Sequence, residues 1–388
     1  MAFFIGKDRE ARRAYGFDEI SLVPSLVTVN PDEVDVTTKI GSAALKIPII
    51  ASAMDGVVDV TFAVEMGKCG GVAVLNSEGV QTRYKNPEEV LKKIVLAKPE
   101  EVTNLLQQIY REPIKEELLS KRIEQIKKGG ALAAISAIPK RAERFSEIAM
   151  EAGADLFIIQ STVTSVRHDS TKYASVDFSK ICKKVRKKMP VIIGNCVTYS
   201  AALALMETGA SGILVGIGPG AACTSRGVLG VGVPQVTSIV DCAAARDFYL
   251  KKFGRYVSII ADGGMVTSGD ICKAFSSGAD AVMIGSGLAK AVEAPGKGFH
   301  WGMAMPDRYL PRGTRIWVGT TALLREILLG PANVDDGTQN LVGALRVSMG
   351  TLGAHNIKEM QLVEIIIAPD IKSEGKVYQK AQKLGMGK

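Results

Sequence analysis

The chain has 388 residues, of which 47% are hydrophobic and 23% are charged, and its formal net charge is +8. This composition is typical of globular proteins and excludes disordered, fibrous and coiled-coil classes. No apolar run reaches the roughly 18 residues that a membrane-spanning helix needs, and the first residues lack the basic and apolar regions of a signal peptide. We therefore expect a cytoplasmic protein with no membrane partner.

The positions of the cysteines, histidines and lysines argue against several kinds of site and partner. The six cysteines are far apart and there are only three histidines, which argues against disulfides, a zinc site and a His-based catalytic triad. The densest basic run, 180–188, contains apolar residues at helical spacing, so it indicates a solvated helix face and no nucleic-acid partner. The net charge remains compatible with an anionic small ligand.

Short, continuously apolar runs recur along the chain and predict parallel strands buried on both faces. These runs are 48–53, 71–76, 131–137, 156–162, 190–197, 212–218, 257–264 and 281–287. Amphipathic segments of helical length separate most of them, for example 141–152, 199–208 and 268–277.

One sequence unit occurs three times, at 151–155, 207–211 and 276–280. In each copy a helix is expected to end at a Gly with positive φ, and a buried strand follows at once. A repeated βα unit with eight apolar runs predicts a (β/α)₈ TIM barrel, with residues 1–388 forming a single domain. The alternative, a doubly wound sheet, needs a Gly-rich strand-to-helix turn early in the chain, and none is present.

Two intervals are too long for simple βα units. Residues 77–130 predict a short helical insertion, and 288–342 a flap region followed by a C-terminal extension.

Barrel active sites lie where strands end, so the loops after the last three strands are the first place to look for chemistry. Residues 216–227 are Gly-rich and carry Cys223 near Arg226. A thiol in such a loop is either a nucleophile with a lowered pKa or simply a small apolar residue, and the loop alone does not distinguish them. The Gly-rich turns at 261–264 and 284–287 indicate a backbone phosphate site, with Asp262 free to accept from a ribose diol; ordinary barrel turns are the alternative.

Together these motifs resemble the IMP dehydrogenase and GMP reductase superfamily, in a branch without CBS domains. The matching segments are 17–19, 51–55, 218–225, 232–235, 261–264, 284–286, 293–296 and 343–350. They occur in the family's order, and their combination is far more specific than any one of them.

The resemblance implies roles for individual residues. Cys223 would form a covalent adduct at C2 of the purine, with Ser225 and Glu293 as a supporting pair. The implied substrate contacts are Ser52, Met54, Asn195, Asp262, Gly263, Gly264, Gly285, Ser286, His300, Gly302 and Met303. The implied contacts of an NAD cofactor are Gln160, Ser161 and Gly216. Backbone carbonyls of Gly218, Gly220 and Cys223 resemble the family's potassium site.

Several positions depart from the family pattern. Gln160 replaces an Asp that meets the nicotinamide ribose, Leu214 an Arg, Ala221 a phosphate-binding Ser, His300 a phosphate-binding Tyr, and Val318 a Glu or Gln that contacts the base. The interval 77–130 lies where many relatives insert two CBS domains and is too short for them.

The resemblance favours an IMP dehydrogenase, which oxidises IMP to XMP with NAD⁺ and then hydrolyses the adduct. Arg308 and Tyr309 match the Arg-Tyr pair that activates water in dehydrogenases; a surface dipeptide is the alternative. Pro219 and the missing CBS domains instead resemble GMP reductases, which deaminate GMP with NADPH. A purine-nucleotide-binding protein without catalysis is a third possibility. The family's assembly implies a homotetramer.

Overall fold

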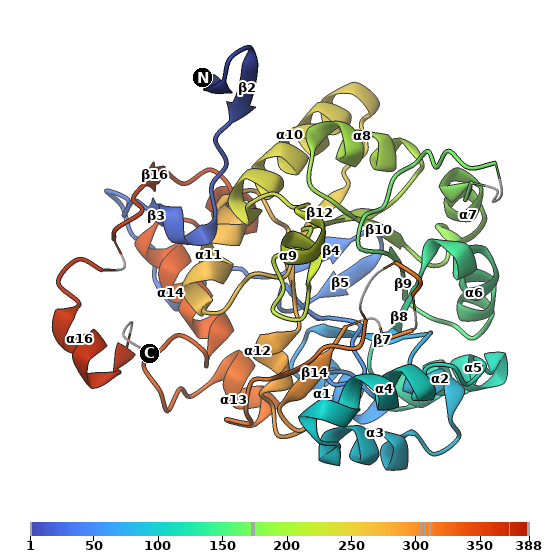
Figure 1. Cartoon of the computed structure of the whole chain (residues 1–388). Helices are drawn as coiled ribbons and strands as arrows, with labels where there is room; N and C mark the ends of the chain where they lie inside the picture. Colours follow the sequence, from blue (N-terminus) through green and yellow to red (C-terminus); the bar gives the residue numbers. More distant parts are fainter. Residues whose placement is uncertain are drawn as a thin grey trace.

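The computed structural model describes residues 2–171, 175–302, 304–305, 307–309, 312–371 and 373–385. Its centre is a closed barrel of eight parallel strands that follow one another in chain order (Figure 1). The strands are β6 (Ile49–Ala51), β7 (Val72–Asn76), β8 (Ala134–Ala137), β9 (Leu156–Gln160), β10 (Val191–Cys196), β11 (Gly212–Val215), β12 (Ser258–Asp262) and β13 (Ala281–Ile284). The predicted TIM barrel is therefore confirmed.

The continuous apolar runs serve two cores at once. Residues such as Ile50 and Ile260 fill the barrel interior, together with Ile40 and Leu45 of the hairpin β4 (Thr38–Ile40) and β5 (Ala43–Leu45). Their neighbours, such as Ile49, pack outward against the helices. Because successive strand side chains point to opposite faces, a strand between two apolar layers needs no polar positions.

The surrounding helices follow the repeat. They are α1 (Val60–Lys68), α5 (Glu116–Lys128), α6 (Pro139–Glu151), α7 (Phe178–Val185), α8 (Tyr199–Glu207), α10 (Gln235–Phe253) and α11 (Ser268–Ser276). The helix-ending glycines of the three repeat copies, Gly153, Gly209 and Gly278, have φ of +80°, +98° and +114°. The expected left-handed glycine after each helix is confirmed.

The interval after β7 is helical and packs against a distant segment. It contains α2 (Val80–Arg83), α3 (Pro87–Leu96), α4 (Pro99–Ile109) and α5. Apolar side chains of α3 and α4, such as Ile94 and Leu106, form a small core that also contains Trp301 and Ala304. The insertion is thus joined to the segment that follows the last barrel strand.

The remaining elements lie outside the barrel. They are β1 (Ala2–Gly6), β2 (Arg9–Arg12), η1 (Phe17–Glu19), β3 (Ile20–Leu22), η2 (Pro31–Glu33), α9 (Ser225–Leu229), α12 (Ser286–Ala289), β14 (Phe299–Trp301), β15 (Arg315–Trp317), α13 (Leu324–Leu329), α14 (Leu341–Thr351), α15 (Ile357–Met360), β16 (Ile365–Ile367) and α16 (Val377–Gln382). The β1–β2 hairpin projects from the body (Figure 1). Across the ranges given above, the structure has no helix that is both long and apolar enough to span a bilayer.

A buried carboxylate secures the start of the last barrel strand. Asp280 is 2% exposed. It accepts hydrogen bonds from the Ile259 amide at 2.8 Å, the Tyr256 hydroxyl at 2.6 Å and Arg246 at 3.3 Å, and it also pairs with Lys358. Burial alone would raise the pKa of Asp280, but the adjacent Arg246 and Lys358 charges hold it below its usual value.

We predict that Asp280→Asn lowers the free energy of unfolding by about 3–5 kcal/mol, because it removes the buried carboxylate that pairs with the buried Arg246 guanidinium. Since the folded-state pKa is depressed, the carboxylate's stabilising contribution is present above the unfolded-state value and is lost as pH falls through the folded-state value. Urea unfolding at several pH values measures both effects.

Asp155 is the matched control, because it occupies the same repeat position and accepts from the Ala133 amide at 2.8 Å, but its partner Lys127 is far more exposed than Arg246. An equal loss of stability in Asp155→Asn and Asp280→Asn would contradict the assignment.

Candidate active site

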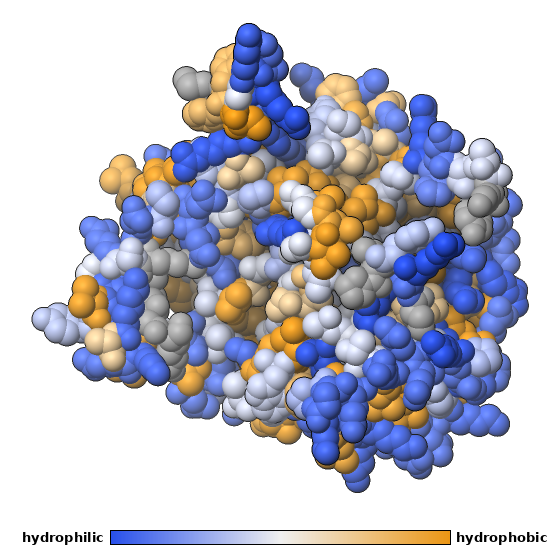
Figure 2. All heavy atoms as spheres, viewed as in Figure 1, coloured by the Kyte–Doolittle hydropathy of each residue, from blue (hydrophilic) through white to orange (hydrophobic). Residues whose placement is uncertain are grey.

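One cavity of about 600 Å³ opens at the carboxyl ends of the barrel strands. Most residues singled out from the sequence line it: Ser52, Met54, Gln160, Ser161, Asn195, Gly216, Gly218, Gly220, Cys223, Ser225, Asp262, Gly263, Gly264, Gly285, Ser286, His300 and Gly302. The volume lies within the usual range for small-molecule sites. Figure 2 shows apolar surface over α9, in the middle of the same face.

The loop after β11 carries the thiol at the cavity. Cys223 is exposed, and its Sγ donates to the Ser225 Oγ at 3.3 Å. Gly216 and Gly218 have φ of +147° and +79°, so side chains at these positions would be strained. Arg226 has a role that the sequence did not indicate. Its guanidinium donates to the Ile217 carbonyl at 3.4 Å and to the Val233 carbonyl at 2.8 Å, and so joins the two ends of the loop.

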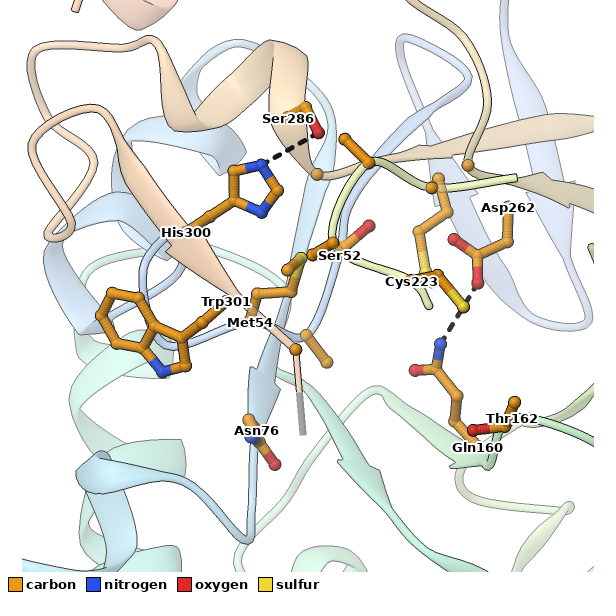
Figure 3. A pocket seen from close by; sticks show the side chains of 18 of the residues that line it. Ser52, Met54, Asn76, Gln160, Thr162, Cys223, Asp262, Ser286, His300 and Trp301 are labelled. Atoms are coloured by element: carbon orange, nitrogen blue, oxygen red, sulfur yellow. Dashed lines mark hydrogen bonds between the residues drawn. The ribbon is translucent and has the colours of Figure 1, made fainter. Parts of the chain in front are cut away.

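Asp262, at the end of β12, lies close to the thiol loop (Figure 3). Its Oδ2 accepts from Asn195 Nδ2 at 2.8 Å and from Gln160 Nε2 at 3.2 Å. Burial of the carboxylate raises the pKa of Asp262 to about 6, while the two amide donors oppose the shift. A carboxylate held in this way can accept hydrogen bonds from vicinal hydroxyls.

The turns after β12 and β13 form a second group of residues. Gly264 has φ of +82°, and a Cβ there would lie 2.9 Å from Pro219 of the thiol loop. Across the cavity, Ser286 Oγ lies 3.0 Å from His300 Nε2 (Figure 3). Burial lowers the pKa of His300, so the imidazole is neutral near pH 7. The group combines backbone amides, a hydroxyl and a neutral ring, which suits a phosphate.

Three of the expected residues that the structure describes do not line the cavity. Glu293 does not line it: its Oε2 accepts from the Leu324 amide at 2.8 Å. The first turn of α13 needs acceptors for its free N–H groups, and Glu293 supplies one, so the expected Ser225–Glu293 pair is replaced by the Ser225–Cys223 contact. Arg308 and Tyr309 are also absent from the cavity wall, and Tyr309 is 81% exposed. Met303 lies outside the described residues.

The structure adds residues that the motifs did not indicate. Arg312 lines the cavity and pairs with Asp307 at 3.1 Å. Asp55 and Tyr110 also line it, and Tyr110 comes from the insertion. Asp55 ends the matched segment 51–55 and could have been selected from it, whereas Tyr110 carries no recognisable local signal.

Two of the residues expected to contact a cofactor are already engaged in hydrogen bonds within the protein. The amide of Gln160 is committed to Asp262, and Ser161 Oγ donates to the Val163 carbonyl at 2.8 Å. The Gly220 carbonyl accepts from the Cys223 amide at 3.0 Å and keeps a second lone pair for a cation. In the part of the chain that the structure describes, no cluster of three His, Cys, Asp or Glu could hold a metal ion.

A closed barrel of eight parallel strands with Gly-rich turns after its last two strands belongs to the TIM-barrel class, whose members often bind phosphate groups at this position. The family model described as "IMP dehydrogenase / GMP reductase domain" matches residues 14–313, and the chain belongs to this family.

The chain is also similar to individual proteins over nearly its whole length. It is 36% identical to a Mycolicibacterium smegmatis protein called an uncharacterized oxidoreductase, over 94% of this chain and 99% of that one. It is 34% identical to the inosine-5'-monophosphate dehydrogenase of Cryptosporidium parvum, over 89% of each chain. A crystal structure of an IMP dehydrogenase/GMP reductase-like protein from Corynebacterium glutamicum superposes with a TM-score of 0.88 at 37% identity, covering 95% of this chain and 98% of that one.

We predict that affinity for a purine nucleotide falls as pH drops through about 6, because protonation of Asp262 removes an acceptor for the ribose hydroxyls. Calorimetric titration of IMP between pH 5 and 7.5 measures this. The nucleotide phosphate also titrates near 6, so Asp262→Asn is the control: it keeps the phosphate effect and loses the carboxylate effect.

Asp262→Asn should bind roughly tenfold or more weakly at pH 7.5, since a hydrogen bond to a charged group contributes about 1.5–3 kcal/mol. Identical pH profiles for the two proteins would refute the role of Asp262.

Proposed function

We propose that the protein is an IMP dehydrogenase that oxidises IMP to XMP with NAD⁺ through a covalent adduct on Cys223. The observation that carries this proposal is the exposed Cys223 thiol at a nucleotide-sized cavity whose walls also hold Asp262 and the Gly-rich turns. Its similarity to the Cryptosporidium dehydrogenase supports the same reaction.

Each part of the nucleotide would contact a different group of residues in the cavity. The turns at Gly263–Gly264 and Gly285–Ser286 would hold the phosphate, while Asp262 would accept from the ribose hydroxyls. This places the base toward Ser52 and Met54, within reach of the thiol loop. The Cys223 thiol would lose its proton to solvent as Sγ bonds to C2, and the C2 hydrogen would leave with its electron pair to NAD⁺. Water would then cleave the C2–sulfur bond to release XMP and return the proton to the thiol.

NAD⁺, when bound, would supply the acceptor for that electron pair. Its contacts on this chain would be Gln160, Ser161 and Gly216, on the Asp262 side of the cavity. The Gln160 amide would have to serve both Asp262 and the cofactor, so cofactor binding depends on the Asp262 carboxylate.

Backbone carbonyls of Gly218, Gly220 and Cys223 would hold a potassium ion that orders the thiol loop. Cytoplasmic location and a homotetramer stay predictions.

GMP reductase is the second candidate, and one observation favours it. Arg308 and Tyr309, which hydrolysis would require, do not line the cavity. Absorbance at 340 nm separates the candidates: IMP with NAD⁺ gives a rise, GMP with NADPH gives a fall, and a protein that only binds nucleotides gives neither. Chromatographic detection of XMP completes the test.

We predict that Cys223→Ala abolishes turnover and leaves IMP binding largely intact. The change removes the nucleophilic sulfur and leaves the other residues that line the cavity unchanged. Cys69→Ala is the matched control, since Cys69 is half-buried and does not line the cavity. Steady-state absorbance and calorimetry measure the two properties. A Cys223→Ala variant that keeps even a tenth of the wild-type rate would exclude the nucleophile assignment.

Arg308→Ala should leave the first step nearly unchanged, giving a burst of NADH close to one per active site. The adduct should then accumulate, because a positioned base typically contributes about 10²–10⁴-fold to a proton transfer. Tyr309→Phe should act in the same way, more mildly. Rapid-mixing absorbance at 340 nm and mass spectrometry of the quenched protein measure these steps.

Arg312→Ala is the comparison, because Arg312 lines the cavity and Arg308 does not. An Arg308→Ala protein with an unchanged steady-state rate and no trapped adduct would favour the reductase.

A further inference from the structure

A buried hydrogen-bonded chain crosses the floor of the cavity. Asp55 is 1% exposed, and its Oδ2 accepts from the Val80 amide at 2.8 Å and from the Tyr110 hydroxyl. The same hydroxyl accepts from Trp301 Nε1 at 2.8 Å. The Tyr110 oxygen therefore joins two side chains that belong to different loops of the barrel.

Both of those loops border the expected base position. Asp55 ends the 51–55 segment, which carries Ser52 and Met54, and Trp301 ends β14 immediately before Gly302. Figure 3 shows Trp301 and Met54 on the same side of the cavity. A shift of either loop would move residues that frame the ligand.

Tyr110 itself is fixed from the insertion side. It follows α4, its amide donates to the Leu106 carbonyl at 3.0 Å, and its ring packs in the small core of the insertion. The Arg83 guanidinium lies 5.7 Å from the ring centroid. The insertion therefore fixes the position of the Tyr110 hydroxyl. Its hydrogen bonds to Asp55 and Trp301 then hold the two loops relative to the insertion.

We propose that Tyr110 is a positioning residue, which holds the 51–55 loop and the β14 segment in the arrangement that binds the purine base. The proposal rests on the proposed function for the identity of the ligand. It assigns to the insertion a direct part in forming the nucleotide site.

The first test uses the free protein and does not depend on any ligand. The chain has two tryptophans, so Trp317→Phe leaves Trp301 as the only indole emitter. In that background Tyr110→Phe should blue-shift the emission, because the indole N–H loses its acceptor. Backbone hydrogen exchange should also become faster in residues 51–58.

Tyr84→Phe is the matched control. Tyr84 belongs to the same insertion, and its hydroxyl donates to the Ile109 carbonyl at 2.9 Å rather than to a residue of either loop. It should change neither the emission nor the exchange of 51–58. Unchanged emission and exchange in Tyr110→Phe, or equal changes in Tyr84→Phe, would overturn the proposal even if both variants lose stability.

The second test measures the consequence for the ligand. Tyr110→Phe should raise the KM for IMP, or weaken GMP binding, by roughly tenfold, since an unpaired buried polar group often costs this much. The rate at saturation should fall far less. A loss confined to kcat would overturn the positioning role. Failure of wild type to bind either nucleotide would refute the proposed function, whereas the emission and exchange measurements would still decide whether Tyr110 holds the two loops.

Discussion

The carboxylate of Asp262 is the interaction on which the cavity depends most. It accepts from Asn195 at the end of β10 and from Gln160 at the end of β9, so one buried group ties three strand ends together. The backbone of the same residue is equally constrained, because its carbonyl accepts from Gln235 and a Cβ at Gly216 would lie 2.3 Å from that oxygen. The thiol loop can leave β11 in its observed direction only because residue 216 is a glycine.

The fold could be predicted from local pattern because each barrel strand meets the same requirement. A strand enclosed by two apolar layers reads as a continuous apolar run, and the glycine that ends each repeat has the φ that a helix-to-strand turn demands. The strands proved shorter than the apolar runs. Residues 257–264, for example, contain a strand only over Ser258–Asp262, because the last glycines turn away from the sheet to form the rim of the cavity.

The site was predictable where its residues follow strands directly and much less so elsewhere. Asp262 and Cys223 could be placed because parallel strands end at one rim. Glu293 could not be placed, because the need of α13 for an acceptor is a tertiary requirement with no local signature. The same holds for Tyr110, whose partners lie 55 and 191 positions away in the chain. Family motifs identify candidate site residues in the sequence, but tertiary packing determines which of these residues line the cavity.

The helical insertion contacts several segments that border the cavity, although it follows only one of the barrel strands. Besides Tyr110, it holds the segment that leads into β15: Gln107 donates to the Arg312 carbonyl at 3.1 Å, and Arg315 donates to the Ala97 carbonyl at 2.8 Å. The loops of a barrel leave separate strands and have no common support of their own. Here α3 and α4 provide that support for both the floor and the edge of the cavity. We therefore expect a sequence change in these helices to alter the cavity through packing, without lining it directly.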